Sequence, residues 1–205
     1  MTELEKALAD IEAIKGQIAR TREFRGYGPA TVALTGALAM IAGLIQHLWL
    51  GQPAEQVAAY IAIWITTAVF AAALIGVETV TRSRRLHSGL ADEMLATAIG
   101  QFMPTIAAGL LLTFVLFRFA PQSLWMLPGL WQILFSLGIF ASCSLLPKTL
   151  FAAGIWYLAC GLAVLAVASG DWAFSPWAMA VPFGAGQLIF SALLHRALGG
   201  IDGEA

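Results

Sequence analysis

Ionisable side chains are scarce in the apolar parts of this sequence, so the few present are the first candidates for chemistry. Glu78 lies inside an apolar stretch, residues 57–80, and His195 lies at the inner end of the last such stretch. Ionisable groups within a membrane are typical of gating or proton coupling. A carboxylate one turn from the end of a helix, close to Arg82, can equally form an ion pair at the membrane boundary. Both interpretations of Glu78 stay open.

Metal and enzyme chemistry have little support. His47 lies at the opposite end of a membrane-length stretch from His87 and His195, roughly 30 Å away. No ligand spacing such as H-x3-H or C-x2-C occurs, nor does a catalytic motif such as G-x-S-x-G or H-E-x-x-H. We therefore expect no metal, no cofactor and no enzymatic activity.

Glutamines are the other polar side chains within the apolar stretches. A buried amide needs hydrogen-bond partners, so it either bridges neighbouring helices or lines a polar path. Three prolines also interrupt these stretches and would let helices bend around such a path. The glutamines are Gln46, Gln101, Gln132 and Gln187, and the prolines are Pro104, Pro128 and Pro182.

The elements that must position these side chains are long apolar stretches. With 60% hydrophobic and 11% charged residues, the chain is far more apolar than a soluble domain, and its net charge of −1 does not favour a nucleic-acid partner. Six stretches come close to the roughly 20 residues that cross a bilayer: 29–50, 57–80, 94–117, 124–146, 150–168 and 177–194. The predicted fold class is all-α, a polytopic membrane protein with six transmembrane helices.

Basic residues predict the orientation. If the N-terminus is cytoplasmic, Arg118 alone among the 11 Lys and Arg residues lies on the outer side, a strong positive-inside bias. Four tryptophans near the outer boundary would form an aromatic belt: Trp49, Trp125, Trp172 and Trp177. We expect a lipid bilayer as the environment, in a plasma membrane or bacterial-type inner membrane, with both termini in the cytoplasm.

Residues 1–28 predict a cytoplasmic amphipathic helix followed by a hinge. Thr2 and Glu5 form a capping box, and apolar residues recur at helical spacing at Leu4, Ile11, Ile14 and Ile18. One interpretation is a coiled coil that joins subunits; the other is a helix on the inner leaflet or across the cytoplasmic mouth of the bundle. Residues 29–196 would form the bundle and residues 197–205 a short flexible cytoplasmic tail.

Glycines predict close helix packing. The first and fifth stretches share the pattern P-x-T-x4-G-x6-GL, which places Gly36 and Gly43, and Gly154 and Gly161, seven residues apart on one helix face. This similarity suggests an internal repeat of three helical hairpins, although the middle hairpin lacks the pattern.

Two functions remain open. The first is a homo-oligomeric sensor, scaffold or accessory subunit, whose leading helix and basic inner loop (Arg82, Arg84 and Arg85) contact a soluble cytoplasmic partner. The alternative is a transporter or channel for a small solute, with a path lined by bent helices and buried glutamines, and with Glu78 and His195 near its inner mouth. The near absence of charge within the stretches favours the first.

Overall fold

The described part of the chain consists of helices joined by short turns. The computed structural model describes residues 28–86, 89–143, 150–167 and 170–202, and these ranges contain helices and no strand. The α-helices are α2 (Pro29–Trp49), α3 (Val57–Leu86), α4 (Gly89–Phe119), α5 (Leu127–Ser142), α6 (Phe151–Val167) and α7 (Pro176–Asp202). Two short 3-10 helices, η1 (Pro121–Met126) and η3 (Gly170–Phe174), precede α5 and α7. The all-α prediction is confirmed, while the predicted leading helix lies outside the described residues.

Five of these helical segments are long and apolar enough to cross a membrane: Pro29–Trp49, Val57–Thr81, Gly100–Phe119, Pro121–Ser142 and Pro176–Arg196. The sixth apolar helix, α6, is shorter, with 17 residues. The fourth segment begins earlier than the sequence indicated because η1 continues directly into α5, where Pro128 sits in the first turn and needs no hydrogen bond from its nitrogen.

The segment between the second and third apolar stretches, residues 81–93, is largely helical and not a loop. Helix α3 continues to Leu86 and α4 begins at Gly89, so residues 87–88 alone separate them. Helix α7 likewise continues to Asp202, past the predicted start of a flexible tail. Charged residues ended the apolar stretches in the sequence, but a helix in water needs no apolar side chains to retain its backbone hydrogen bonds.

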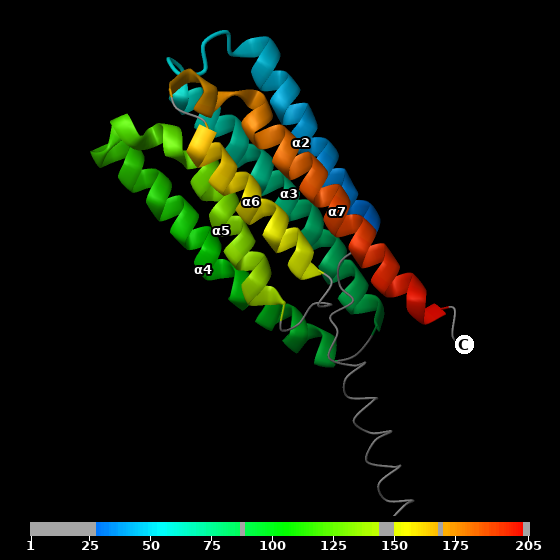
Figure 1. The fold of residues 1–205 in the computed structure, drawn as a ribbon. Helices are drawn as coiled ribbons and strands as arrows, with labels where there is room; N and C mark the ends of the chain where they lie inside the picture. Colours follow the sequence, from blue (N-terminus) through cyan, green and yellow to red (C-terminus); the bar gives the residue numbers. More distant parts are fainter. Residues whose placement is uncertain (1–27, 87–88, 144–149, 168–169, 203–205) are drawn as a thin grey trace, which may run out of the picture.

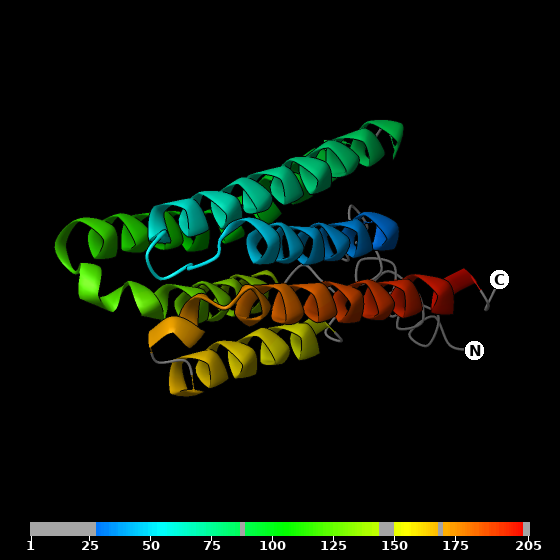
Figure 2. The ribbon, with the colours of Figure 1, turned by 90° about the horizontal axis from the view of Figure 1, so that it is seen from above.

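The six helices form a ring in chain order. Each helix packs against the next along the chain, and α7 returns to pack along α2 (Figure 1). Seen from above, α3 and α4 lie along one edge and α6 lies along the opposite edge (Figure 2). The pairs α2–α7 and α5–α6 have the most extensive contacts, whereas α3 and α4 touch only sparsely. The ring is therefore least closed between α3 and α4.

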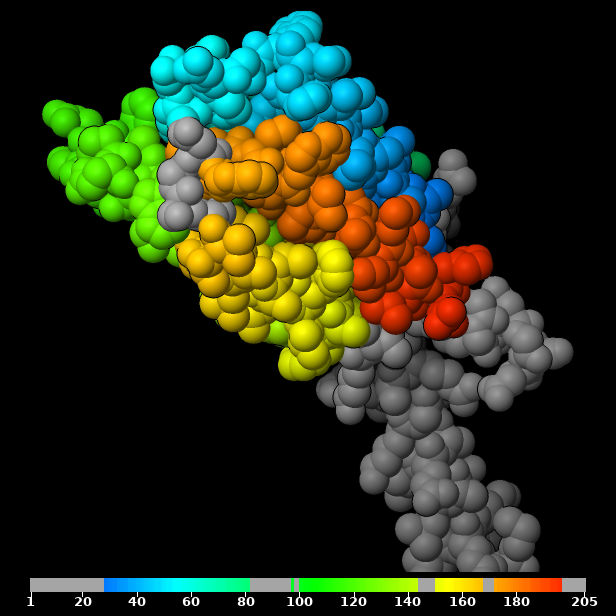
Figure 3. Space-filling view, turned by 45° about the horizontal axis from the view of Figure 1, so that its top comes forward, coloured from blue at the N-terminus to red at the C-terminus, as the bar shows by residue number. Residues whose placement is uncertain are grey.

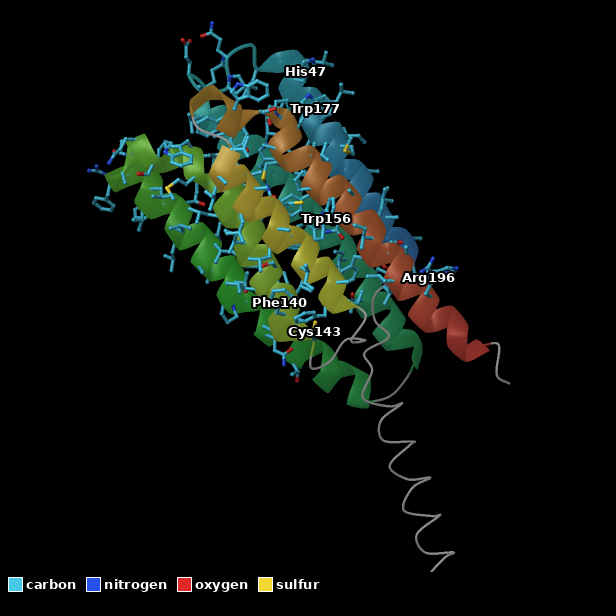
Figure 4. The ribbon with its side chains drawn as sticks, in the orientation of Figure 1. His47, Phe140, Cys143, Trp156, Trp177 and Arg196 are labelled. Carbon is cyan, nitrogen blue, oxygen red and sulfur yellow. The ribbon has the colours of Figure 1, made fainter. Side chains whose placement is uncertain are left out.

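The apolar core lies toward one end of the ring. It combines the second half of α2 with the beginnings of α3, α5 and α7, where Tyr60, Leu127 and Ala180 are fully buried. His47 and Trp177 mark this end in Figure 4, and Arg196 and Cys143 lie toward the other. Under the predicted orientation this end would face outward.

Glycines bring α2 onto α7 and α6 onto α5. A Cβ atom at Gly43 would lie 2.5 Å from Ala180 Cβ, and one at Gly161 would lie 2.8 Å from the carbonyl oxygen of Gly129. Gly36 lies against Gln187 in the first pair, and Gly154 lies against Phe140 in the second. Figure 3 shows α2, α7 and α6 side by side across one face. All four glycines that the sequence singled out thus lie buried at helix crossings within the chain.

The two crossings share one register. The positions that face the glycines are Pro176, Ala180 and Gln187 on α7, and Gly129, Ile133 and Phe140 on α5. These two sets have the same spacing along their helices. The pair α2–α7 and the pair α6–α5 therefore repeat the same antiparallel contact.

Candidate functional site

The polar side chains that the structure brings together lie at the start of α7. Gln46, on the last turn of α2, is fully buried, and its amide both donates and accepts a hydrogen bond. Its Nε2 donates to the Phe174 carbonyl oxygen at 2.7 Å, and its Oε1 accepts from Trp64 Nε1 at 2.9 Å. Gln46 therefore joins α2 to α3 and to the turn between η3 and α7.

Gln132 makes a second such link, to a carbonyl group one helical turn beyond Phe174. This side chain of α5 is fully buried, and its Nε2 donates to the Ala178 carbonyl oxygen at 2.8 Å. In an α-helix the nitrogen of residue 182 would donate to that oxygen, but residue 182 is proline and has no N–H. Gln132 thus supplies from α5 the hydrogen bond that Pro182 removes from α7.

The proline turn of α7 is held from a third helix as well. Trp156 of α6 donates from Nε1 to the Pro182 carbonyl oxygen at 3.0 Å, and Figure 4 shows its side chain beside α7. Tyr157 packs its ring against Phe135 and Phe183, with ring centroids 4.7 and 5.2 Å apart. Helices α5, α6 and α7 are therefore joined around Pro182 by hydrogen bonds and stacked rings.

Three buried polar atoms near these clamps have no hydrogen-bond partner among the described residues: Tyr60 Oη, Tyr157 Oη and Gln132 Oε1. Leaving a polar atom unpaired in an apolar interior costs about 1–3 kcal/mol. The Tyr157 hydroxyl lies against Gly186, where a Cβ atom would come within 2.6 Å of it. These three atoms could each still form a hydrogen bond inside the bundle.

The N-terminal end of α2 is also held by hydrogen bonds on two sides. Gly28, which caps α2 without a side chain, donates its backbone N–H to Glu78 Oε2 at 3.2 Å. Ser191 of α7 donates from Oγ to the Pro29 carbonyl oxygen at 2.7 Å. A carboxylate beside a helix N-terminus is electrostatically favourable. Glu78 thus holds the start of α2 against α3.

The predicted ligand and gating residues do not form one site. Gln132 lies in the first half of α5, whereas Glu78 lies in the second half of α3 and the exposed His195 lies in the second half of α7, toward the opposite end of the bundle. Gln101 is half-buried on α4, and Gln187 is half-buried where α7 crosses α2.

Several predicted contact residues fall outside the described side chains. Leu4, Ile11, Ile14 and Ile18 precede residue 28, and the side chains of Arg82, Arg84 and Arg85 are likewise outside the described set. Among the described residues, no group of three or more His, Cys, Asp or Glu side chains could hold a metal. Cys143 and Cys160 are free.

The sequence did not point to the tryptophan donors. Trp64 bonds Gln46, and Trp131 Nε1 donates to Thr113 Oγ1 at 2.9 Å, each joining a helix to the one that follows it. Both pairs have the same separation of 18 residues along the chain. This shared separation becomes apparent only from the structure, because a tryptophan in an apolar stretch does not indicate which residue will accept its hydrogen bond.

Comparison with known proteins adds no relative, because no protein-family model, curated protein or solved structure matches the chain. The arrangement itself consists of amides, indoles and hydroxyls directed at backbone carbonyl groups. Such groups can hold helices together and can exchange partners, but they supply neither a nucleophile nor a general base at the described clamps.

Proposed function

We propose that this chain is a homo-oligomeric membrane scaffold or accessory subunit with six membrane-crossing helices. Both ends lie in the cytoplasm, and the leading segment and the basic residues between α3 and α4 contact a soluble partner. The bilayer surrounds the ring, in a plasma membrane or bacterial-type inner membrane.

Helix length and charge support the membrane part of this proposal. Helix α6, with its 17 residues, stands at the lower limit of the roughly 17–25 residues that cross a bilayer. Large apolar side chains on α3 and α4, including Phe70, Leu111 and Phe114, are exposed, as lipid-facing residues would be. The bias of Lys and Arg supports the orientation.

The scaffold function is carried by one observation, the use of the buried glutamines as clamps. The amides of Gln46 and Gln132 donate to carbonyl groups of the turn and helix they touch, within an apolar core. A path for a solute needs polar groups that are free to exchange with that solute. Amides that hold α2, α3, α5 and α7 in place favour a rigid body that presents its outer and cytoplasmic surfaces to partners.

A second candidate, a transporter or channel for a small solute, has one specific observation in its favour. Tyr60 Oη, Tyr157 Oη and Gln132 Oε1 are buried polar atoms without a hydrogen-bond partner in the described part of the chain, and Pro182 lies inside α7. Water or a small polar solute could pair with such atoms.

Thiol accessibility distinguishes the two functions. In membranes, Gln132→Cys and Gln187→Cys would be treated with a membrane-impermeant maleimide, with Glu55→Cys in the exposed α2–α3 loop as the labelled control. A scaffold predicts labelling at least about a hundredfold slower at both glutamine positions than at Glu55→Cys. Labelling of Gln132→Cys at a rate near that of Glu55→Cys would establish a wet path and overturn the scaffold proposal.

Partner contact is tested by deleting residues 1–25. The full chain and the truncated chain would be compared by photo-crosslinking in living cells, with membrane insertion verified in both. The proposal predicts that crosslinks to soluble proteins are lost while insertion is retained. Equal capture by both chains would show that the leading segment has no such role.

A further inference from the structure

We draw no further inference here: the strongest candidate, the three buried polar atoms Tyr60 Oη, Tyr157 Oη and Gln132 Oε1 inside the bundle, belongs to the polar interior already described, and nothing in the described part of the structure shows what those atoms would bind.

Discussion

The hydrogen bond from Gln132 to the Ala178 carbonyl group should contribute more to the free energy of unfolding when residue 182 is proline than when it is not. Gln132→Leu preserves an apolar side chain of similar length but removes the donor at 2.8 Å from that oxygen. In the native chain Pro182 offers no replacement donor. In a Pro182→Ala background, the N–H of Ala at this position can donate to the same oxygen within α7.

The expected magnitude follows from these contacts. Hydrogen bonds between membrane helices average about 0.6 kcal/mol and reach about 1.7 kcal/mol. The Ala178 oxygen would be left unpaired in a partly buried site, which places the loss between these two values, while removal of the unpartnered Gln132 Oε1 offsets part of it. We expect Gln132→Leu to lower the free energy of unfolding by about 1 kcal/mol with Pro182, and by about 0.3 kcal/mol or less with Pro182→Ala.

The assay is a double-mutant cycle in mixed detergent micelles. Unfolding by increasing SDS fraction, followed by tryptophan fluorescence, gives the stability of the parent, the two single variants and the double variant. Gln187→Leu is the control, because that amide is half-buried and should cost less than about 0.5 kcal/mol. An equal cost of Gln132→Leu in both backgrounds would show that the side chain does not replace the donor that Pro182 lacks.

Three further outcomes are expected. Gln46→Leu should destabilise the chain by about 1–2 kcal/mol in the same assay, because it leaves both the Phe174 carbonyl and the Trp64 N–H without their partner. A loss of stability no greater than that of Gln187→Leu would contradict this prediction. Gly161→Ala should lower the free energy of unfolding by about 1–3 kcal/mol, because the new Cβ would meet the Gly129 oxygen at 2.8 Å. Gly109→Ala, where the nearest neighbour is Leu134 Cδ1 at 3.8 Å, should be neutral or slightly stabilising. Equal effects of the two substitutions would reject the close crossing of α6 and α5. Glu78→Gln should retain the acceptor for the Gly28 N–H and stay within about 0.5 kcal/mol of the parent, whereas Glu78→Ala should cost about 1 kcal/mol, and the opposite order would refute the anchoring role.

Helix type and placement could be predicted from the sequence because they depend on local composition. Apolar stretches near the length of a bilayer predict helices, and five of them are long and apolar enough to cross one. The helices α3 and α4 extend beyond the apolar stretches near residues 81–93, since the change from apolar to charged residues marks where a helix leaves an apolar environment and not where its hydrogen bonds end. The glycine pattern identified helix faces suited to close packing.

The candidate site could be predicted only in part. An amide within an apolar stretch must find a partner, so Gln132 was a candidate from its type and position alone. Its partner could not be known, because Ala178 has no distinctive side chain and its carbonyl oxygen becomes available only through a proline four residues later. Trp64 and Trp156 were missed for a related reason, since an indole N–H has no sequence signal that names its acceptor.

The sequence by itself determined the local properties of this protein: apolar helices, glycine faces suited to close packing, and buried amides that require partners. Tertiary structure alone decided how those properties were used. The glycine faces of α2 and α6 are covered by α7 and α5, and Gln46 and Gln132 bond carbonyl groups on helices distant in sequence, because helix packing brings together residues that no sequence spacing relates.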